Sequence, residues 1–409
     1  MNLKDLIHEC TCPACGYHVA VPFYKNDDQP MATVAWPLSA SQARNMPRYP
    51  LNFMRCIDCG HVYNRSFDYK NVPYSEKPNL MFNKGMIWTE FLSDIINKLS
   101  SNLKPGDTVI EIGYGDGSFI YALAGRNSGV RFTGFDPHGM SAQTADNLTL
   151  RSELFIPGRD IPELRPQLLI SRHVLEHVTN PLGLVESISF ASSITGICPR
   201  IYLEVPCVDN ALENNRIIDF YYEHNSHFTT RSFTRMLECA KVEPEIIDHG
   251  YGGEIIYTLA LVPEINVHKS FSSQATGFFA RSNENIARVR EQLDMLAGKN
   301  VAIWGGTGKA AAFINSYKLD AGRFPTVVDS DKAKAGTFVP GTGQEIRFRD
   351  YLLQHPVEII IIPMHWRAQD IVNEISRNNI GYKQILIEHD GRLTDFFSSQ
   401  HPYKISDNS

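Results

Sequence analysis

The sequence lacks the features of a secreted or membrane-bound protein. Its N-terminal stretch, MNLKDLIHEC, contains no basic segment followed by an apolar one, so we expect no secretory signal. The densest apolar run, residues 359–364, is far too short to span a bilayer. These two absences predict a cytoplasmic protein with no membrane partner.

An excess of positive charge is missing as well. The 409 residues include 39 Lys and Arg and 45 Asp and Glu, which gives a net charge of −6. We expect no nucleic-acid partner, because nothing in the overall charge would attract a polyanion. Hydrophobic residues (43%) and charged residues (21%) occur as in ordinary globular proteins. A chain of this length predicts roughly two or three domains.

Residues 1–80 have little hydrophobic periodicity and are rich in Pro, Asn, Tyr and Cys. They contain two C-x-x-C-G motifs, in which a glycine turn lets both thiolates face one centre. Two such motifs supply the ligands of a closed tetrahedral site, so we predict a small module stapled by a structural zinc ion. The ligands would be Cys12, Cys15, Cys56 and Cys59, and Cys10 could replace one of them. Four buried thiols or a redox dithiol are the alternatives.

From about residue 85 onward, strands alternate with helical stretches. The strands are TVIEI, VRFTGFD, LLIS and IYLEV, and two further strands separated by Gly252 and Gly253 indicate a hairpin. This order predicts an α/β fold over residues 81–265, with a mostly parallel sheet and helices on both faces. A polar helix at about 275–298 and a second set of alternating strands predict a smaller Rossmann-like domain over residues 266–409.

A glycine-rich turn follows the first of these strands. Its glycines let the backbone approach a ligand closely, and Glu111 suits the positively charged amino acid part of S-adenosylmethionine better than a phosphate. The next strand ends at Asp136, where a carboxylate accepts hydrogen bonds from ribose hydroxyls. We predict a class I methyltransferase sheet that binds S-adenosylmethionine through Glu111, Gly113, Gly115, Asp116, Gly117 and Asp136. A packing turn with no ligand is the alternative.

The strand LLIS leads into Arg172 and an H-x-x-E-H motif. In a methyltransferase the loop at this position lies at the edge of the cofactor, so we predict that Arg172 and His173 shape the floor of the cofactor pocket. The motif also fits an inverted zinc protease, in which His173 and His177 would share one face of a helix. No distant third ligand in the sequence supports that alternative.

The segment after the fourth strand, DFYYEHNSHF, is dense in groups that can move protons. We expect it above the carboxyl ends of the sheet, where ligands bind in open α/β folds. A histidine can act as a base near neutral pH, and a tyrosine can donate a hydrogen bond to an enolate oxygen. The candidate catalytic residues are Tyr221, Tyr222, Glu223, His224 and His227. A loop of packed aromatic side chains and solvated histidines is the alternative.

A second glycine-rich turn lies in the C-terminal domain. Residues 306–311, GTGKAA, fit G-x-G-x-x-A between a strand and a helix, and Asp329 follows about 20 residues later. Taken alone, this pattern is typical of an NAD site. The spacing does not fit a phosphate-binding P-loop.

The order of these motifs resembles the sugar C-methyltransferases of deoxysugar pathways, which methylate C-3 of nucleotide-linked 4-keto-6-deoxysugars. The resemblance covers nearly the whole chain. It rests on the paired C-x-x-C-G motifs and on VIEIGYGDGSF, ISRHVLEH, YLEVP, YYEHNSHF, YGGE and AIWGGTGKAAAF. It implies a zinc-binding N-terminal domain, a central S-adenosylmethionine domain and a C-terminal Rossmann-like domain, with the sugar nucleotide between the last two.

The resemblance also implies roles for single residues. In the family's Y-H-E-H stretch the final His is the base, which corresponds to His224, with Glu223 beside it and Tyr221 as the leading Tyr. Tyr222 stands where the family commonly has His, and His227 where it commonly has Tyr, so His227 competes with His224 as the base.

For the substrate, the resemblance implies contacts from Tyr74, although the serines that usually follow the stretch Pro73–Lys77 are absent. It also implies that Gly306, Gly308 and Lys309 belong to a degenerate nucleotide fold that helps to hold the substrate's nucleotide. The predicted function is therefore C-methylation of a keto-sugar nucleotide through an enolate, by a monomer or homodimer. The alternatives are O-methylation of a sugar or small metabolite, an NAD-dependent oxidoreductase, and a zinc-stapled binding protein without catalysis.

Overall fold

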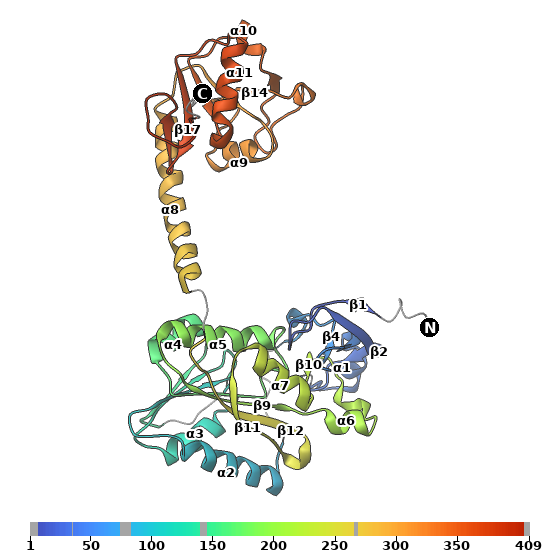
Figure 1. Ribbon diagram of the computed structural model, residues 1–409. Helices are drawn as coiled ribbons and strands as arrows, with labels where there is room; N and C mark the ends of the chain where they lie inside the picture. The colour runs from blue at the N-terminus through green and yellow to red at the C-terminus, as the bar shows by residue number, and fades with distance from the viewer. Residues whose placement is uncertain (1–6, 35, 74–82, 140–144, 266–268, 405–409) are drawn as a thin grey trace. The chain divides into compact units, whose positions relative to one another are not determined.

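The computed structural model describes residues 7–34, 36–73, 83–139, 145–265 and 269–404. The chain divides into two compact units, Met1–Val267 and His268–Ser409 (Figure 1). Among the described residues, no helix is both long enough and apolar enough to cross a bilayer.

A five-stranded antiparallel sheet with the order β1-β2-β3-β4-β10 forms one part of the first unit. Its strands are β1 (His8–Glu9), β2 (Val19–Pro30), β3 (Arg48–Cys56), β4 (Val62–Asn64) and β10 (Ser226–His227). The short helix α1 (Ala40–Arg44) lies in the connection between β2 and β3. The last strand comes from far along the chain, and its His227 is the partner of Val62. The cysteine-rich module therefore contains a strand from the DFYYEHNSHF segment.

The second part of this unit is a seven-stranded sheet with the order β11-β12-β9-β8-β5-β6-β7. Its strands are β5 (Thr108–Ile112), β6 (Arg131–Phe135), β7 (Leu148–Arg151), β8 (Leu168–Arg172), β9 (Arg200–Pro206), β11 (Glu243–Gly250) and β12 (Ile255–Leu261). Strands β5 to β9 run parallel, and β11 and β12 form the predicted antiparallel hairpin at the edge. The predicted α/β fold is confirmed.

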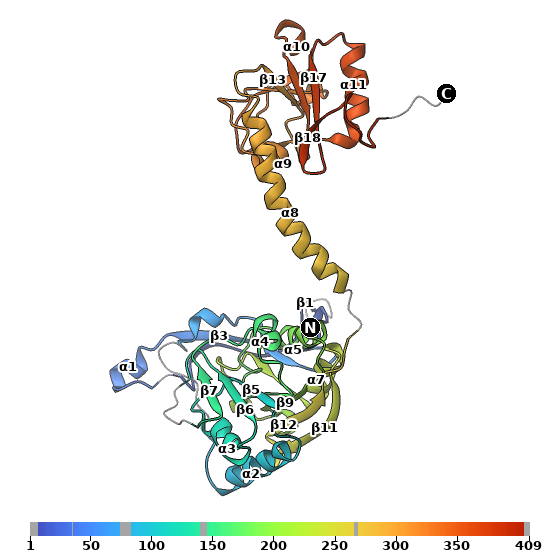
Figure 2. The ribbon, with the colours of Figure 1, turned by 90° about the vertical axis from the view of Figure 1, so that its left-hand side faces the viewer.

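Helices cover both faces of this sheet because its buried strands are apolar on both sides. One face packs against α2 (Met86–Ser100) and α3 (Ser118–Arg126), and the other against α4 (Pro157–Leu164), α5 (Pro181–Thr195) and α7 (Thr230–Cys239). Figures 1 and 2 show these two layers. From β5 the chain adds β6 and β7 on one side and β8 and β9 on the other, so the order reverses beside β5. Ligands bind at such reversals, at the carboxyl ends of the strands.

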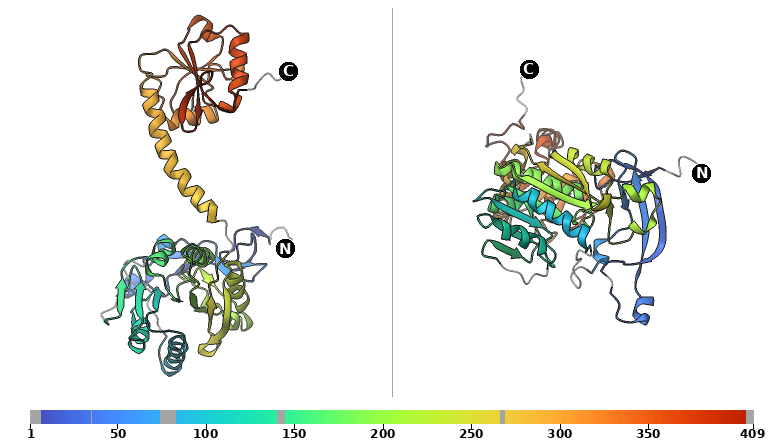
Figure 3. Two further views of the ribbon diagram at one scale, coloured as in Figure 1. Left: turned by 60° about the vertical axis from the view of Figure 1, so that its left-hand side comes forward. Right: turned by 90° about the horizontal axis from the view of Figure 1, so that it is seen from below.

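The second unit contains a six-stranded sheet with the order β15-β14-β13-β16-β17-β18, parallel except for the last pair. Its strands are β13 (Val301–Trp304), β14 (Thr326–Asp329), β15 (Ile346–Phe348), β16 (Ile359–Ile362), β17 (Gln384–His389) and β18 (Arg392–Asp395). One face packs against α8 (Lys269–Asp294) and α9 (Lys309–Ser316), and the other against α11 (Ala368–Arg377) (Figure 3). This is the α/β domain that the alternating strands predict.

Candidate active site

A cavity of about 810 Å³ opens at the carboxyl ends of the central strands of the seven-stranded sheet. The glycine-rich turn after β5, the loops after β6 and β8, and the segment before β10 all contribute to its walls. The predicted residues in its lining are Glu111, Gly113, Gly115, Asp116, Asp136, Arg172, His173, Tyr221, His224 and His227. The fold thus brings the predicted cofactor residues and three of the predicted catalytic residues to one cavity.

The glycine-rich turn has a backbone that only glycine can adopt without strain. Gly113 has a φ of +75°, and a Cβ atom there would overlap Cγ2 of Val174. Its N–H donates to the carbonyl of Phe135 (2.7 Å), which joins the turn to the end of β6. Gly117 is buried at the start of α3 and lies outside the cavity lining. Gly113 and Gly115 expose backbone to a ligand, whereas Gly117 permits the entry into the helix.

Glu111 is a buried carboxylate that faces the cavity, with only 2% of its surface exposed. Its Oε2 atom has no hydrogen-bond partner among the described residues. Burial raises the pKa of Glu111 to about 8, and the nearby Glu204 and Asp116 add to the effect. A cation entering the cavity would supply the missing partner, so this residue fits the ammonium group of S-adenosylmethionine.

Cofactor binding should therefore depend on pH. At pH 7 the empty site holds Glu111 mostly protonated, because its pKa lies near 8. A bound cation favours the carboxylate, so binding expels a proton and affinity rises with pH between about 6 and 7.5. Calorimetry in two buffers of different ionisation enthalpy should detect this proton release. In Glu111→Gln the release should disappear and the affinity should fall. Equal proton release in both proteins would contradict the assignment.

Asp136 lies where the second parallel strand ends, as the sequence predicts. Its Oδ2 accepts a hydrogen bond from the N–H of Gly115 (2.9 Å), and its Oδ1 accepts one from the N–H of His138 (2.8 Å). The carboxylate thereby holds the glycine-rich turn against the loop after β6. It is half-buried and lines the cavity, which leaves it accessible to ribose hydroxyls.

We expect Asp136→Ala to weaken S-adenosylmethionine binding by about 10- to 100-fold while the protein stays folded. Hydrogen bonds to charged groups contribute roughly 1.5–3 kcal/mol, and ribose hydroxyls would lose their acceptor. Calorimetry gives the affinity, and the thermal unfolding transition checks the fold. Asp107→Ala, in the turn that precedes β5 at the opposite end of the strand, is the matched control and should bind normally. Unchanged affinity in Asp136→Ala would show that this carboxylate does not contact the cofactor.

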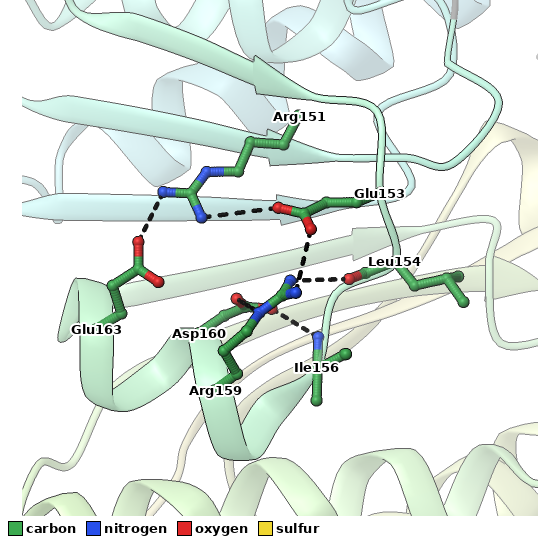
Figure 4. Close-up of polar contacts among 7 residues, drawn as sticks. All are labelled: Arg151, Glu153, Leu154, Ile156, Arg159, Asp160 and Glu163. Carbon is green, nitrogen blue, oxygen red and sulfur yellow. Dashed lines mark hydrogen bonds and ion pairs between the residues drawn. The ribbon is translucent and has the colours of Figure 1, made fainter.

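The wall beside Asp136 contains Leu154 and Phe155. Ion pairs and hydrogen bonds join the residues on either side of this wall, as Figure 4 shows. Arg151 pairs with Glu163 (2.8 Å), and Arg159 pairs with Glu153 (3.1 Å). Arg159 also pairs with the buried Asp160 (2.6 Å), which accepts the N–H of Ile156 (2.6 Å). The two apolar side chains are therefore presented to the cavity from a tethered segment.

Arg172 and His173 line the cavity, and the fully buried Glu204 holds both of them from behind. Arg172 Nη2 and His173 Nε2 each lie 3.0 Å from Glu204 Oε1, and Tyr202 donates to Glu204 Oε2 (2.6 Å). Burial opposes ionisation of Glu204, but the two cations outweigh it and lower its pKa to about 2. Burial likewise opposes protonation of His173, yet Glu176 and Glu204 raise its pKa to about 9. The only sequence signal for Glu204 is a carboxylate within an apolar strand.

The structure corrects the zinc-protease alternative. The H-x-x-E-H motif forms a turn, and the following helix α5 starts only at Pro181. His173 has a φ of +51°, which is incompatible with an α-helix. His173 and His177 therefore do not share a helical face, and the motif does not build a protease site.

His224 and Tyr221 form a hydrogen-bonded pair at the cavity, with 2.8 Å between Tyr221 Oη and His224 Nε2. Burial lowers the pKa of His224 well below its usual range, and the neighbouring His177, His227 and His173 add to the effect. Burial raises the pKa of Tyr221, assisted by Glu176 and Glu223. At neutral pH the pair consists of a neutral imidazole and a neutral phenol, which can take up and donate a proton respectively.

His227 lines the cavity but belongs to the cysteine-rich module. Its Nε2–H donates to the carbonyl of Asp219 (2.9 Å), and its ring packs edge-on against Phe53 at 5.1 Å between ring centres. Burial lowers the pKa of His227 to about 4. These contacts hold the ring in β10, so its position is set by packing within the module.

Tyr222 and Glu223 point away from the cavity. Tyr222 Oη accepts from the N–H of Asp68 (2.9 Å), and its ring stacks on Tyr49 at 4.7 Å. Glu223 Oε1 accepts from the N–H groups of Ala32 and Thr33, both at 2.7 Å. Neither side chain lines the cavity. Their contacts anchor the segment that carries Tyr221 and His224 to the module.

His177 and Glu176 are further cavity residues outside the set predicted to be catalytic. His177 Nδ1 lies 2.9 Å from the carbonyl of Glu223, and its ring is perpendicular to that of His224 at 4.7 Å. Donor atoms of Glu176, His177 and His224 all lie within 4.8 Å of one another. In the sequence these two residues are marked by the H-x-x-E-H motif. Their proximity to His224 depends on tertiary packing.

The four predicted zinc ligands come together in the module. The Sγ atoms of Cys12, Cys15, Cys56 and Cys59 lie within 4.8 Å of one another, with 3.7 Å from Cys12 to Cys59 and from Cys15 to Cys56. A tetrahedron with Zn–S bonds of about 2.3 Å has edges of about 3.8 Å, so the cluster can bind zinc. Cys10 Sγ instead contacts Tyr63 Oη (3.1 Å) and is not part of the cluster.

The predicted substrate residues Gly306, Gly308 and Lys309 belong to the second unit. Tyr74 falls outside the described residues. In the second unit, Lys309 begins α9 and lines a cavity of about 410 Å³ together with His365, Trp366 and His389. Its Nζ lies 4.3 Å from the centre of the Trp366 ring. Gly306 and Gly308 are in the preceding turn and outside that lining, and Gly306 packs against Ile346.

Asp329 is the carboxylate that an NAD site would use to bind the ribose. It ends β14, and its Oδ2 pairs with Lys334 Nζ (3.1 Å). Its Oδ1 accepts the N–H of Asp331 (2.9 Å). Asp329 is buried in its own loop, so it is less accessible to a ribose than the half-buried Asp136.

Comparison with known proteins agrees with this geometry. Residues 83–241 match a family model described as a methyltransferase domain, and residues 261–384 match one described as a C-methyltransferase C-terminal domain. C-methyltransferase NovU of Streptomyces niveus is 22% identical over 303 residues, which cover 66% of this chain and 70% of NovU.

Similar solved structures include an S-adenosylmethionine-dependent methyltransferase from Aquifex aeolicus, at 12% identity and a TM-score of 0.32 over 48% of this chain and 100% of that one. Another is the magnesium protoporphyrin IX methyltransferase of Synechocystis PCC 6803 with bound SAH, at 12% identity and a TM-score of 0.33 over 44% of this chain and 90% of that one. The two family models, which match neighbouring parts of the chain, and the glycine-rich turn at its cavity make this protein an S-adenosylmethionine-dependent C-methyltransferase.

Proposed function

We propose that the protein methylates C-3 of a nucleotide-linked 4-keto-6-deoxysugar through an enolate. The observation that carries this proposal is the neutral His224–Tyr221 pair in the same cavity as Glu111 and Asp136. Methylation at carbon needs a base for a C–H proton and a donor for the enolate oxygen. Both groups are present beside the predicted cofactor residues, and the match to a C-methyltransferase model supports a carbon acceptor.

The chemistry follows from the acidity of a C–H bond next to a ketone. His224 removes this proton, and Tyr221 donates a hydrogen bond to the oxygen on which negative charge develops. S-adenosylmethionine supplies the methyl group on a sulfonium, from which the enolate carbon takes it. Glu204 fixes Arg172 and His173 in the cavity wall, and these side chains limit the water that reaches the reacting atoms.

The remaining predicted sites have supporting roles in this proposal. Zinc at the four cysteines is structural, because a closed set of four sulfur ligands leaves no open position. Residues 1–80 form the zinc module, residues 81–265 bind S-adenosylmethionine, and residues 266–409 contribute to binding the nucleotide. In that last part, Lys309 offers a positive charge to a phosphate, and Trp366 offers an aromatic face to a base.

The test is product analysis with a panel of 4-keto-6-deoxysugar nucleotides and S-adenosylmethionine. Mass spectrometry should detect a gain of one methyl group, and NMR should place it on the carbon next to the ketone. A methyl group on oxygen would overturn the enolate mechanism and favour the O-methyltransferase alternative. No product from any keto-sugar nucleotide, with S-adenosylmethionine binding intact, would overturn the substrate class.

A further inference from the structure

Glu176 is the least explained charged group at the cavity. It lies in the turn between β8 and α5, and only 1% of its surface is exposed. Neither carboxylate oxygen accepts a hydrogen bond from any described residue. It forms an ion pair with His173, whose Nδ1 lies 3.3 Å from Glu176 Oε1. Burying a carboxylate is costly even when one ion pair offsets its charge, and this cost suggests a functional role for Glu176.

The surroundings of Glu176 indicate that function. Its carboxylate lies within 4.8 Å of ring nitrogens of both His177 and His224. Each of these rings has another hydrogen-bond partner, the carbonyl of Glu223 for His177 and Tyr221 Oη for His224. The carboxylate therefore acts on the rings through its charge. An opposite charge at this separation typically raises a histidine pKa by about 1–3 units.

We propose that Glu176 is a positioning residue that stabilises His224 in the protonated form produced by proton abstraction. This inference rests on the proposed function, in which His224 is the base. In that step the substrate C–H bond breaks, its electron pair moves into the enolate, and the proton bonds to a ring nitrogen of His224. The ring gains one positive charge beside the negative charge of Glu176, and nothing is oxidised or reduced.

This role resolves a conflict in the site. A histidine whose pKa is strongly lowered by burial stays neutral but is a weak base. A fixed carboxylate beside it favours the imidazolium at the moment the proton arrives. His173, the other cation beside Glu176, also pairs with Glu204 (3.0 Å), so it keeps a counter-charge of its own.

Several titratable groups share this part of the cavity, and any pH profile reflects all of them. They come from the turn after β8 and from the segment that ends in β10. They are His173, Glu176, His177, Asp219, Tyr221, Glu223, His224 and His227.

The experiment compares Glu176→Gln with the wild-type full-length chain. The readout is exchange of the substrate C–H in deuterated water, measured from the lowest pH at which the protein stays folded up to about pH 9. The substrate is the sugar nucleotide that is methylated in the product assay, and S-adenosylhomocysteine replaces the methyl donor. We expect exchange on the pH plateau to slow about 10-fold or more. The part of the profile in which the rate falls at low pH, the acid limb, should move down by about one pH unit. S-adenosylmethionine affinity should change less than about twofold.

Two variants separate this role from a structural one. Glu176→Asp keeps the charge one methylene farther away and should restore part of the exchange rate, with a smaller shift of the limb. It also provides the test if Glu176→Gln does not fold. Glu223→Gln is the matched control, because that carboxylate binds the backbone of residues 32–34. It should leave the acid limb in place whatever it does to the rate.

The outcomes distinguish this inference from the proposed function. An unmoved acid limb in Glu176→Gln overturns the inference, because a purely structural carboxylate would lower the rate at every pH. A second metal ion per chain that is lost in Glu176→Gln also overturns it, since the cluster would then be a metal site. Undiminished exchange in His224→Ala overturns the proposed function itself, independently of Glu176.

Discussion

Replacing His224 with alanine is expected to lower turnover about 100- to 10,000-fold, which is the usual contribution of a general base. The affinity for S-adenosylmethionine should hardly change, because the imidazole is assigned to the sugar. Deprotonation can be followed separately by exchange of the substrate C–H with deuterated water, and we expect the same loss there. Initial rates, exchange and calorimetry on one preparation would give all three quantities.

Two variants of the same segment serve as controls. His227→Ala should lose less activity, because its ring donates to the carbonyl of Asp219 and packs on Phe53. Tyr221→Phe should retain some exchange yet lose rate, since an enolate donor contributes roughly a few kcal/mol at most. If His227→Ala abolished exchange while His224→Ala preserved it, the assignment of the base would be wrong. If neither variant mattered, acid–base catalysis by this segment would be excluded.

Removing a zinc ligand should be the most disruptive single change to the fold of the first unit. We expect Cys56→Ser to reduce the metal content from about one zinc per chain to near zero and to abolish most turnover. Binding of structural zinc contributes about 10–16 kcal/mol to folding in small modules. Metal analysis, thermal unfolding and activity would measure the three effects.

The structure explains why this damage should reach the cavity. Strand β4 follows Cys59 after only two residues, and its Val62 is the partner of His227 in β10. Glu223 is tied to the module through the backbone of Ala32 and Thr33. Loss of the module would therefore release the segment that carries His224.

The exposed Cys198 provides the control for this prediction. Cys198→Ser should keep both the metal and the activity, because this thiol lies outside the four-cysteine cluster. Protein made without chelators and containing no metal would contradict the zinc assignment. Full activity in metal-free protein would instead show that the module holds the segment that carries His224 without a bound zinc ion.

Much of the cavity around the glycine-rich turn could be predicted because its signals are local. The strand Thr108–Ile112, the glycine-rich turn and the carboxylate at the end of β6 follow from short patterns. Gly113 and Gly115 have positive φ angles, which favour glycine regardless of the surrounding tertiary structure. The four-cysteine cluster is predictable for the same reason, since the C-x-x-C-G spacing already places each pair of thiols on one side of a turn.

The other end of the cavity could be located from the sequence, but its individual residues could not be told apart. The sequence places the whole segment Tyr221 to His227 beyond the fourth parallel strand, and composition does not reveal which of its residues line the cavity. Pairing of β10 with β4 decides this, because it fixes His227 in the module while Tyr221 and His224 line the cavity. That pairing joins residues more than 160 positions apart, which no local pattern encodes.

The order of strands and helices, the glycine-rich turn and the four cysteines able to hold zinc follow from the sequence, because backbone geometry and ligand spacing are short-range properties. How the charged groups act depends on the packing of the folded chain. Glu204 is ionised because Arg172 and His173 surround it, and His224 is neutral because burial and three other histidines oppose its charge. Protonation depends on desolvation and on charges a few ångströms away, and packing between distant parts of the chain sets both.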